Sequence, residues 1–478
     1  MRKVIFLQVI KEQWFSSIRA DVLAGIVVGL ALIPEALAFS FIVGVDPKVA
    51  LYASFTMAVM TAFVGGRPAM ISAATGAMAL ILVTLMANHG LQYVLAATIL
   101  TGIIQFFMGI FGVARLMRFI PNSVMLGFVN ALGIMIFLAQ LPYLKNGSVA
   151  TYAFAIVTLI LVYVIPRFIR IIPAPLIAIV IMTSLAIFGN FSLLTIGDLG
   201  TMPTTLPTFF LPDIPLNFET LQIILPYALA LAVVGLLESL LTAQVLDGYT
   251  KTTSNKNKES RGQGIANIVN GFFGGMAGCA LIGQSIINVK SGGRGRLSTL
   301  TAGVFLLFLI LVLGDVVSKI PMPVLVGVMI MVSFTTFDFK TIRFIRKAPK
   351  SESFIMITTV IVILATHNLA IGVGVGVLMS AIRFMVKSAT PTFLLTGETC
   401  TITGPLFFAS AEKLAPIVEN FQGKKLEFDF SNSRIWDETA VTKVLEIKNQ
   451  LEQEGVHVTF TGLDLQSQQL LERLTPIK

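Results

Sequence analysis

Charged side chains are scarce in this chain. Asp, Glu, Lys and Arg make up 12% of its 478 residues, about half the share usual in a soluble protein, while 55% are hydrophobic. The two cysteines, Cys279 and Cys400, are too few for a disulfide or metal framework and are interpreted as small packing residues. Because no nucleotide-binding loop and no nucleophile–base pair stands out, we expect neither an enzyme nor a cofactor.

Long apolar runs dominate the first 390 residues. They are long enough to span a bilayer as α-helices, and they lack the alternation of a transmembrane barrel. The sequence therefore predicts a polytopic α-helical membrane protein in contact with the lipid bilayer. The fourteen candidate segments lie near residues 22–44, 50–65, 69–88, 92–113, 121–141, 150–166, 171–189, 220–245, 260–275, 279–293, 297–315, 321–337, 353–367 and 369–386.

The net charge of +9 comes from basic residues that cluster at the ends of alternate segments. If the N-terminus lies inside, the even-numbered segments end among these clusters, whereas the long outer loop 190–219 has no Lys or Arg. This asymmetry follows the positive-inside rule, so it indicates a membrane and not nucleic acid as the partner. We expect both termini in the cytoplasm, with residues 1–20 forming an amphipathic segment and not a signal peptide.

Seven plus seven segments would form inverted repeats over residues 21–190 and 220–390. Segment 1 then corresponds to segment 8, and each carries one glutamate, Glu35 or Glu238, inside its apolar stretch. A carboxylate at membrane depth costs roughly 2.5–3.5 kcal/mol, so it usually faces a cavity or a pathway. Glu35 could carry a proton. Glu238 and Thr242, four residues apart, could offer oxygens to a cation such as sodium or shuttle a proton.

Segments 3 and 10, the other matched pair, begin with small residues and glycine. This pattern predicts half-length helices preceded by extended chain, at residues 69–73 and 279–282. A helix start offers free N–H groups and the positive end of the helix dipole, which together favour an anion. The alternative is that the small residues only let helices pack closely. The two starts are expected at Thr75 and Gly76 and at Gly283, Gln284 and Ser285, with Phe39 as a candidate side wall.

The chain changes character after residue 390. LEFDFS and VHVTFTG alternate as strands do, SAEKLAPIVENF is typical of a helix capped by Ser410, and a second helix is expected from Asp437 to Gly455. Alternating strands and helices predict a small cytoplasmic α/β domain over residues 391–478.

The motifs DVLAGIVVGLALIPEALAFS, GQGIANIVNGFFGG and INVKSGGRGRLS, followed by this α/β domain, resemble the bacterial SulP (sulfate permease) family of anion transporters with a C-terminal STAS domain. The resemblance covers essentially the whole chain. It implies a bacterial inner-membrane protein with a core (segments 1–4 and 8–11), a gate (5–7 and 12–14), a homodimer and elevator-like alternating access. It also implies an anion pocket at Phe39, Gly76, Ala77, Met78, Gly283, Gln284 and Ser285, proton coupling at Glu35, and a cation site at Glu238 and Thr242.

Two positions depart from that family pattern. Many members carry arginine where this chain has Gln284, and without that positive charge the case for sulfate as the substrate is weaker. Sodium-coupled bicarbonate members carry aspartate where this chain has Glu238. The leading hypothesis is a proton-coupled secondary transporter of small inorganic or carboxylate anions, with sulfate first. The alternatives are a sodium-coupled bicarbonate transporter or anion exchanger, a nucleobase permease of the same general fold, and an anion channel.

Overall fold

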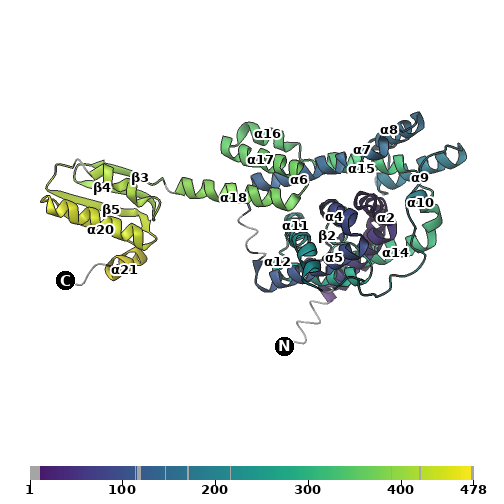
Figure 1. Cartoon of the computed structure of the whole chain (residues 1–478), viewed down its shortest axis with the longest axis horizontal. Helices are drawn as coiled ribbons and strands as arrows, with labels where there is room; N and C mark the ends of the chain where they lie inside the picture. The colour runs from purple at the N-terminus through teal and green to yellow at the C-terminus, as the bar shows by residue number, and fades with distance from the viewer. Residues whose placement is uncertain are drawn as a thin grey trace. The chain divides into compact units, whose positions relative to one another are not determined.

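The computed structural model describes residues 11–113, 115, 120–145, 147–169, 172–215, 217–388, 390–418 and 421–474. Half of the predicted N-terminal segment 1–20 therefore lies outside the described residues. The chain divides into two compact units, Met1–Val377 and Leu378–Lys478, and Figure 1 shows the elements of each.

The first unit, Met1–Val377, is called the membrane unit, and its first half follows the first seven predicted segments. Segment 3 is broken as expected, because a short strand precedes its helix. The elements are α2 (Ile18–Val43), α3 (Pro47–Val64), β1 (Ser72–Ala74), α4 (Gly76–His89), α5 (Leu91–Ile110), α6 (Asn122–Leu138), α7 (Leu141–Leu144), α8 (Val149–Val164), η2 (Ile165–Arg167), α9 (Ala174–Phe188) and α10 (Ile196–Leu199).

The second half repeats this order, again with a strand before its third helix. Among the described residues, nine helices are long and apolar enough to cross a membrane unaided, while α4 and α9 are shorter apolar helices. The elements are α11 (Phe218–Thr250), α12 (Lys256–Phe272), β2 (Gly278–Ala280), α13 (Ile282–Lys290), α14 (Arg296–Ser318), α15 (Met322–Thr336), α16 (Lys340–Lys347), α17 (Lys350–Thr366) and α18 (Leu369–Ser388), which continues into the second unit after Val377.

These helices pack as two groups. In the first, α12 lies against α5 and α3, and α14 lies against α2 and α3; in the second, α15 packs on α6 and α8, and α17 on α6. Close crossings depend on glycine. A Cβ on Gly264 of α12 would lie only 2.5 Å from the backbone nitrogen of Phe106 on α5. The helices named in the first group belong to the predicted core, and those named in the second belong to the predicted gate.

The helix α12 is polar because its side chains hold the two short strands in place. Asn267 Nδ2 donates to Gln105 Oε1 on α5 (2.9 Å) and to the carbonyl oxygen of Gly278 on β2 (3.0 Å). Gln263 Nε2 donates to Ser72 Oγ on β1 (2.7 Å). These bonds satisfy buried polar groups inside the first group, where an unpaired amide would be costly.

The second unit is a four-stranded sheet covered by helices. The strand order is β3-β4-β5-β6, with β3 and β4 antiparallel and the other neighbours parallel. The elements are β3 (Thr392–Thr396), β4 (Thr399–Leu406), η3 (Ala411–Leu414), α19 (Ala415–Val418), β5 (Lys425–Ile435), α20 (Glu438–Gln453), β6 (His457–Thr461) and α21 (Leu465–Leu474).

Of the two predicted helix caps in this unit, one makes the expected hydrogen bond and the other does not. Asp437 caps α20, since its side chain accepts a hydrogen bond from Ala440 N (2.9 Å). Ser410 holds the predicted N-cap position, before η3, but its side chain makes no cap bond there. Its hydroxyl instead accepts from Phe407 N (3.0 Å), three residues earlier. A local turn competed successfully for that hydroxyl.

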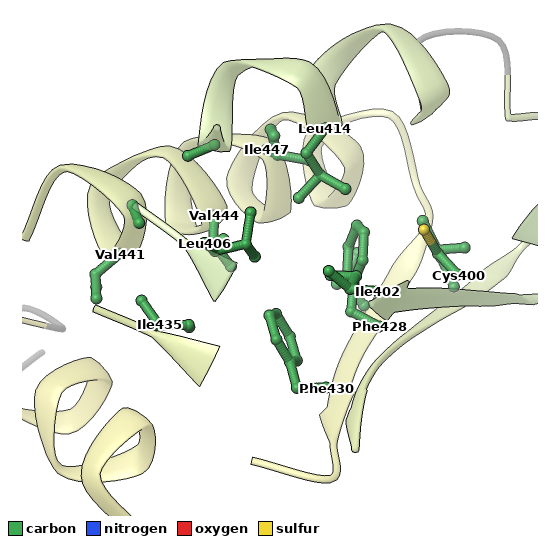
Figure 2. Packing of buried hydrophobic residues seen from close by; sticks show 14 of the residues in the cluster. Cys400, Ile402, Leu406, Leu414, Phe428, Phe430, Ile435, Val441, Val444 and Ile447 are labelled. Atoms are coloured by element: carbon green, nitrogen blue, oxygen red, sulfur yellow. The ribbon is translucent and has the colours of Figure 1, made fainter. Parts of the chain in front are cut away.

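The core of the second unit lies between the sheet and its helices, as Figure 2 shows. Phe428 and Phe430 of β5 point into it and are fully buried with Val444 and Ile447 of α20. Their spacing of two residues places both rings on one face of the strand. This apolar cluster, and not the few surface ion pairs, holds the unit together.

Truncating a buried ring should therefore weaken the second unit. We expect Phe430→Ala to lower its free energy of unfolding by about 3–5 kcal/mol, because the change removes packed surface and leaves a cavity. Phe408→Ala is the matched control, since that ring is 63% exposed. Urea unfolding of the full chain, followed by Trp436 emission in a Trp14→Phe background, measures the difference. Equal midpoints for the two variants would contradict this packing.

Candidate functional site

A short antiparallel strand pair brings the two halves of the membrane unit together. Residues 72–74 of β1 pair with residues 278–280 of β2, and Leu281 N donates to the carbonyl oxygen of Ile71 (2.9 Å). Both predicted extended pieces are thus present in the structure. The helix α4 starts at Gly76 as expected, and α13 starts at Ile282, one residue before the predicted position.

The start of α4 is covered by two side chains. A Cβ added to Gly76 would lie 3.0 Å from Phe39 Cε1 of α2 and 3.1 Å from Ile136 Cδ1 of α6. The amide groups of Gly76 and Ala77 belong to the first turn and have no acceptor within the helix. The Met78 amide instead donates to Thr75 Oγ1 (3.4 Å), so it is the least available of the three predicted positions.

The start of α13 is more open. Gly283 is exposed, and a Cβ there would meet nothing within 4 Å. Gln284 Nε2 donates to Glu35 Oε1 (2.8 Å), while Gln284 Oε1 is buried without a hydrogen-bond partner among the described residues. Ser285 is less available than predicted, because its hydroxyl accepts from Ile71 N (2.9 Å) and holds the strand pair.

The helix α2 links the two starts. Glu35 contacts Gln284 at the start of α13, and Phe39, one turn later, lies against Gly76 at the start of α4. Four residues of α-helix rise by about 6 Å, so one turn of α2 separates the two contacts. Glu35 is half-buried, whereas Phe39 is only 2% exposed. A carboxyl group, an aromatic ring and two helix starts therefore border the same small region.

Glu238 has a partner that sequence reasoning missed. Its Oε2 accepts a hydrogen bond from Cys279 Sγ (2.7 Å), and the same sulfur lies 3.1 Å from Thr75 Oγ1, the cap of α4. Cys279 was interpreted as a packing residue, but it also connects Glu238 to the start of α4. Only its place just before the half-helix could have drawn attention to it.

The predicted Glu238–Thr242 pair has a different arrangement from the one expected. Thr242 Oγ1 donates to the backbone carbonyl oxygen of Glu238 (2.7 Å), four residues earlier in the same helix, so its proton does not reach the carboxylate. Such back-bonding is common for threonine inside membrane helices. The carboxylate group of Glu238 is instead turned toward β2.

Comparison with known protein families gives two matches. The profile described as "Sulfate permease family" matches residues 18–148 and 142–359, and the "STAS domain" profile matches residues 398–475. A Bacillus subtilis (strain 168) protein named "Putative sulfate transporter YbaR" is 51% identical over 471 residues, which cover 97% of this chain and 98% of that protein.

Two solved structures share the fold. The transmembrane domain of the cyanobacterial bicarbonate transporter BicA matches with a TM-score of 0.66 at 26% identity, over 77% of this chain and 98% of that one. The murine Solute Carrier 26 family member A9 anion transporter, in the inward-facing state, matches with a TM-score of 0.83 at 17% identity, over 95% and 87%. The predicted fold class is confirmed: the chain belongs to the sulfate permease family, as a polytopic helical membrane protein followed by a STAS domain.

Proposed function

We propose that this chain is a secondary active transporter that carries a small anion, sulfate first, together with a proton. The observation that carries the proposal is the antiparallel β1–β2 pair, from which α4 and α13 both start beside the region bordered by Glu35 and Phe39. Helix starts bind anions without needing a cationic side chain. The Bacillus subtilis relative, named as a sulfate transporter, supports sulfate as the first candidate.

Glu35 is the proposed proton carrier. Its carboxyl group is hydrogen-bonded to Gln284 at the anion site, so the protonation state of one and the occupancy of the other would influence each other. Protonating the carboxyl group removes a negative charge beside the incoming anion and therefore favours its binding. This linkage would couple anion entry to a proton gradient.

Alternating access would come from movement of one helix group against the other. In this proposal the core group (α2–α5 and α11–α14) carries the site past the gate group (α6, α8, α9, α15, α17 and α18), within a homodimer. Residues from both groups meet at Gly76, where Phe39 belongs to the core and Ile136 to the gate. A shift of the core would separate these two side chains and uncover the start of α4.

Uptake into proteoliposomes tests the proposed function. Labelled sulfate, bicarbonate and fumarate are offered with and without an inward proton gradient. We expect gradient-driven accumulation of one anion, up to about tenfold for one pH unit and one proton, since one unit corresponds to about 1.4 kcal/mol. Uptake of none of the three, or uptake that uracil abolishes by competition, would contradict anion transport. Ion currents far above carrier turnover would indicate a channel instead.

A sodium-coupled bicarbonate transporter is the second candidate, and one contact favours it. The buried Gln284 Oε1 lacks a donor among the described residues, and bicarbonate has a hydroxyl group that could donate, whereas sulfate has none. The fold match to a bicarbonate transporter supports the same direction. A sodium gradient that drives bicarbonate uptake, with no effect of a proton gradient, would establish this candidate over the first.

The Cys279 thiol gives a further prediction at this site. We expect Cys279→Val to reduce uptake roughly tenfold or more, because a hydrogen bond to a charged group contributes about 1.5–3 kcal/mol and Glu238 would lose the one from the thiol. Cys279→Ser is the matched control, since its hydroxyl can still donate, and it should keep most activity. If the two variants transport equally well, the thiol serves only as packing.

A further inference from the structure

The short helix α16 separates its charges from its apolar side chains. Lys340, Arg343, Arg346 and Lys347 are all exposed, and their spacing of three, three and one residues gathers them on one side of the helix. The other side carries Thr341, Ile342, Phe344 and Ile345. Of these, Ile342 is 51% and Ile345 42% exposed, so protein covers that side only in part.

The position of α16 is fixed by the membrane helices around it. Asn130 on α6, itself only 3% exposed, donates through Nδ2 to Thr341 Oγ1 (2.7 Å) and accepts at Oδ1 from Asp338 N (2.8 Å). On the other side, Ser353 Oγ of α17 lies 3.4 Å from the carbonyl oxygen of Ile345. Figure 1 shows α16 beside α17 at the edge of the membrane unit.

The charge around α16 is strongly one-sided. From residue 338 to 352 the chain has Lys340, Arg343, Arg346, Lys347 and Lys350 against only Asp338 and Glu352. Asp338 accepts from the Lys340 backbone amide (2.9 Å), and Glu352 has an interaction of its own. The four basic side chains of α16 form no ion pair with another described residue. Their charge is therefore available to a partner outside the chain.

We propose that α16 is a docking surface for the headgroups of anionic phospholipids. A helix with one basic and one apolar side, joined at both ends to membrane helices, lies in the plane of the interface: Ile342 and Ile345 face acyl chains, and the basic side faces phosphate groups. The helix α16 lies on the side of the membrane that the basic clusters predict to be cytoplasmic. Anionic lipids of that leaflet attract basic segments. Because Asn130 ties α16 to α6, bound headgroups anchor the second helix group to the leaflet.

Native mass spectrometry of the full-length protein tests this docking. Detergent-solubilised protein receives phosphatidylglycerol or phosphatidylcholine with the same acyl chains, and the bound lipids are counted. We expect the wild type to retain phosphatidylglycerol preferentially. Each basic residue near an anionic surface strengthens binding by roughly fivefold, so changing Lys340, Arg343, Arg346 and Lys347 to Gln should lower the phosphatidylglycerol-to-phosphatidylcholine ratio about tenfold or more.

Two further variants keep the test decisive. A four-site Gln variant of the second unit, at Lys424, Lys425, Lys443 and Lys448, removes equal charge elsewhere and should bind lipid as the wild type does. Exchanging Arg343 and Arg346 for Lys keeps the charge and should also preserve the ratio. The proposal is overturned if the α16 Gln variant keeps the wild-type ratio, if the wild type does not distinguish the two lipids, or if inorganic phosphate at equal concentration displaces the bound lipid.

Discussion

The Glu35→Gln protein should take up anion at the same rate with and without an inward proton gradient. Glutamine has the shape of glutamate, and its side-chain oxygen can still accept the hydrogen bond from Gln284 Nε2. The substitution therefore removes ionisation while leaving the contact between α2 and α13 in place. Gradient-driven accumulation should fall from about tenfold per pH unit to none, since one unit is about 1.4 kcal/mol per proton.

Two controls accompany this measurement: the same substitution at another glutamate, and an anion-exchange assay. Glu219→Gln changes an exposed carboxylate in the first turn of α11 and should leave the gradient response intact. Anion exchange without a gradient should survive in Glu35→Gln, because binding by the helix starts does not require the carboxyl group. A Glu35→Gln protein that still accumulates anion as the wild type does would show that Glu35 is structural and move coupling to Glu238.

A larger side chain at the start of α4 should reduce anion uptake by a similarly large factor. We expect Gly76→Val to reduce anion uptake more than tenfold, because the added methyl groups must displace Phe39 or Ile136, and overpacking costs about 1–3 kcal/mol. The same groups would also stand between an anion and the amide groups of the first turn. Initial uptake rates, normalised to protein in the liposome, measure the loss.

Two glycine controls separate a blocked site from a misfolded protein. Gly248→Val on α11 introduces the same side chain where a Cβ would meet nothing within 4 Å, so it should transport normally. Gly76→Ala adds only the Cβ, 3.0 Å from Phe39 Cε1, and should give an intermediate rate. Normal uptake by Gly76→Val, at unchanged thermal stability, would mean that the anion does not bind at this helix start.

The sequence predicted the parts of the site that depend on local pattern. The broken segments were visible because small residues and glycines interrupt otherwise apolar runs, and Glu35 and Glu238 were visible because carboxylates are rare at membrane depth. The helix start was expected at Thr75 and Gly76 from the small residues there. In the structure Thr75 caps α4, because its hydroxyl accepts from the Met78 amide.

Contacts between distant residues could not be predicted in the same way. The Glu35–Gln284 bond joins residues 249 positions apart, and the Cys279–Glu238 bond joins residues 41 apart on different elements. Ile136 reaches Gly76 only because α6 packs beside α4. Ser285 was assigned to the anion pocket, yet its hydroxyl serves the strand pair through Ile71. A single sequence contains no signal that decides between such partners.

In the second unit, prediction failed where the elements are short or exposed. The strands β3 and β4 were not predicted: β3 has no fully buried position, and β4 carries Gly404 and Pro405, which interrupt a strand pattern. The long helix α20 was predicted correctly, because its buried positions recur at three- and four-residue intervals between Asp437 and Gly455.

Locating a bound anion would show whether the two helix starts form the binding site. Selenate has the shape and charge of sulfate, and its selenium can be identified by anomalous diffraction from crystals of the full chain with ordinary methionine. We expect one peak within hydrogen-bond reach of the amide groups of Gly76 and Ala77 or of Gly283 and Gln284, beside Phe39. A peak elsewhere, such as among the outer-loop residues near Lys48, with none between the two helix starts, would contradict it.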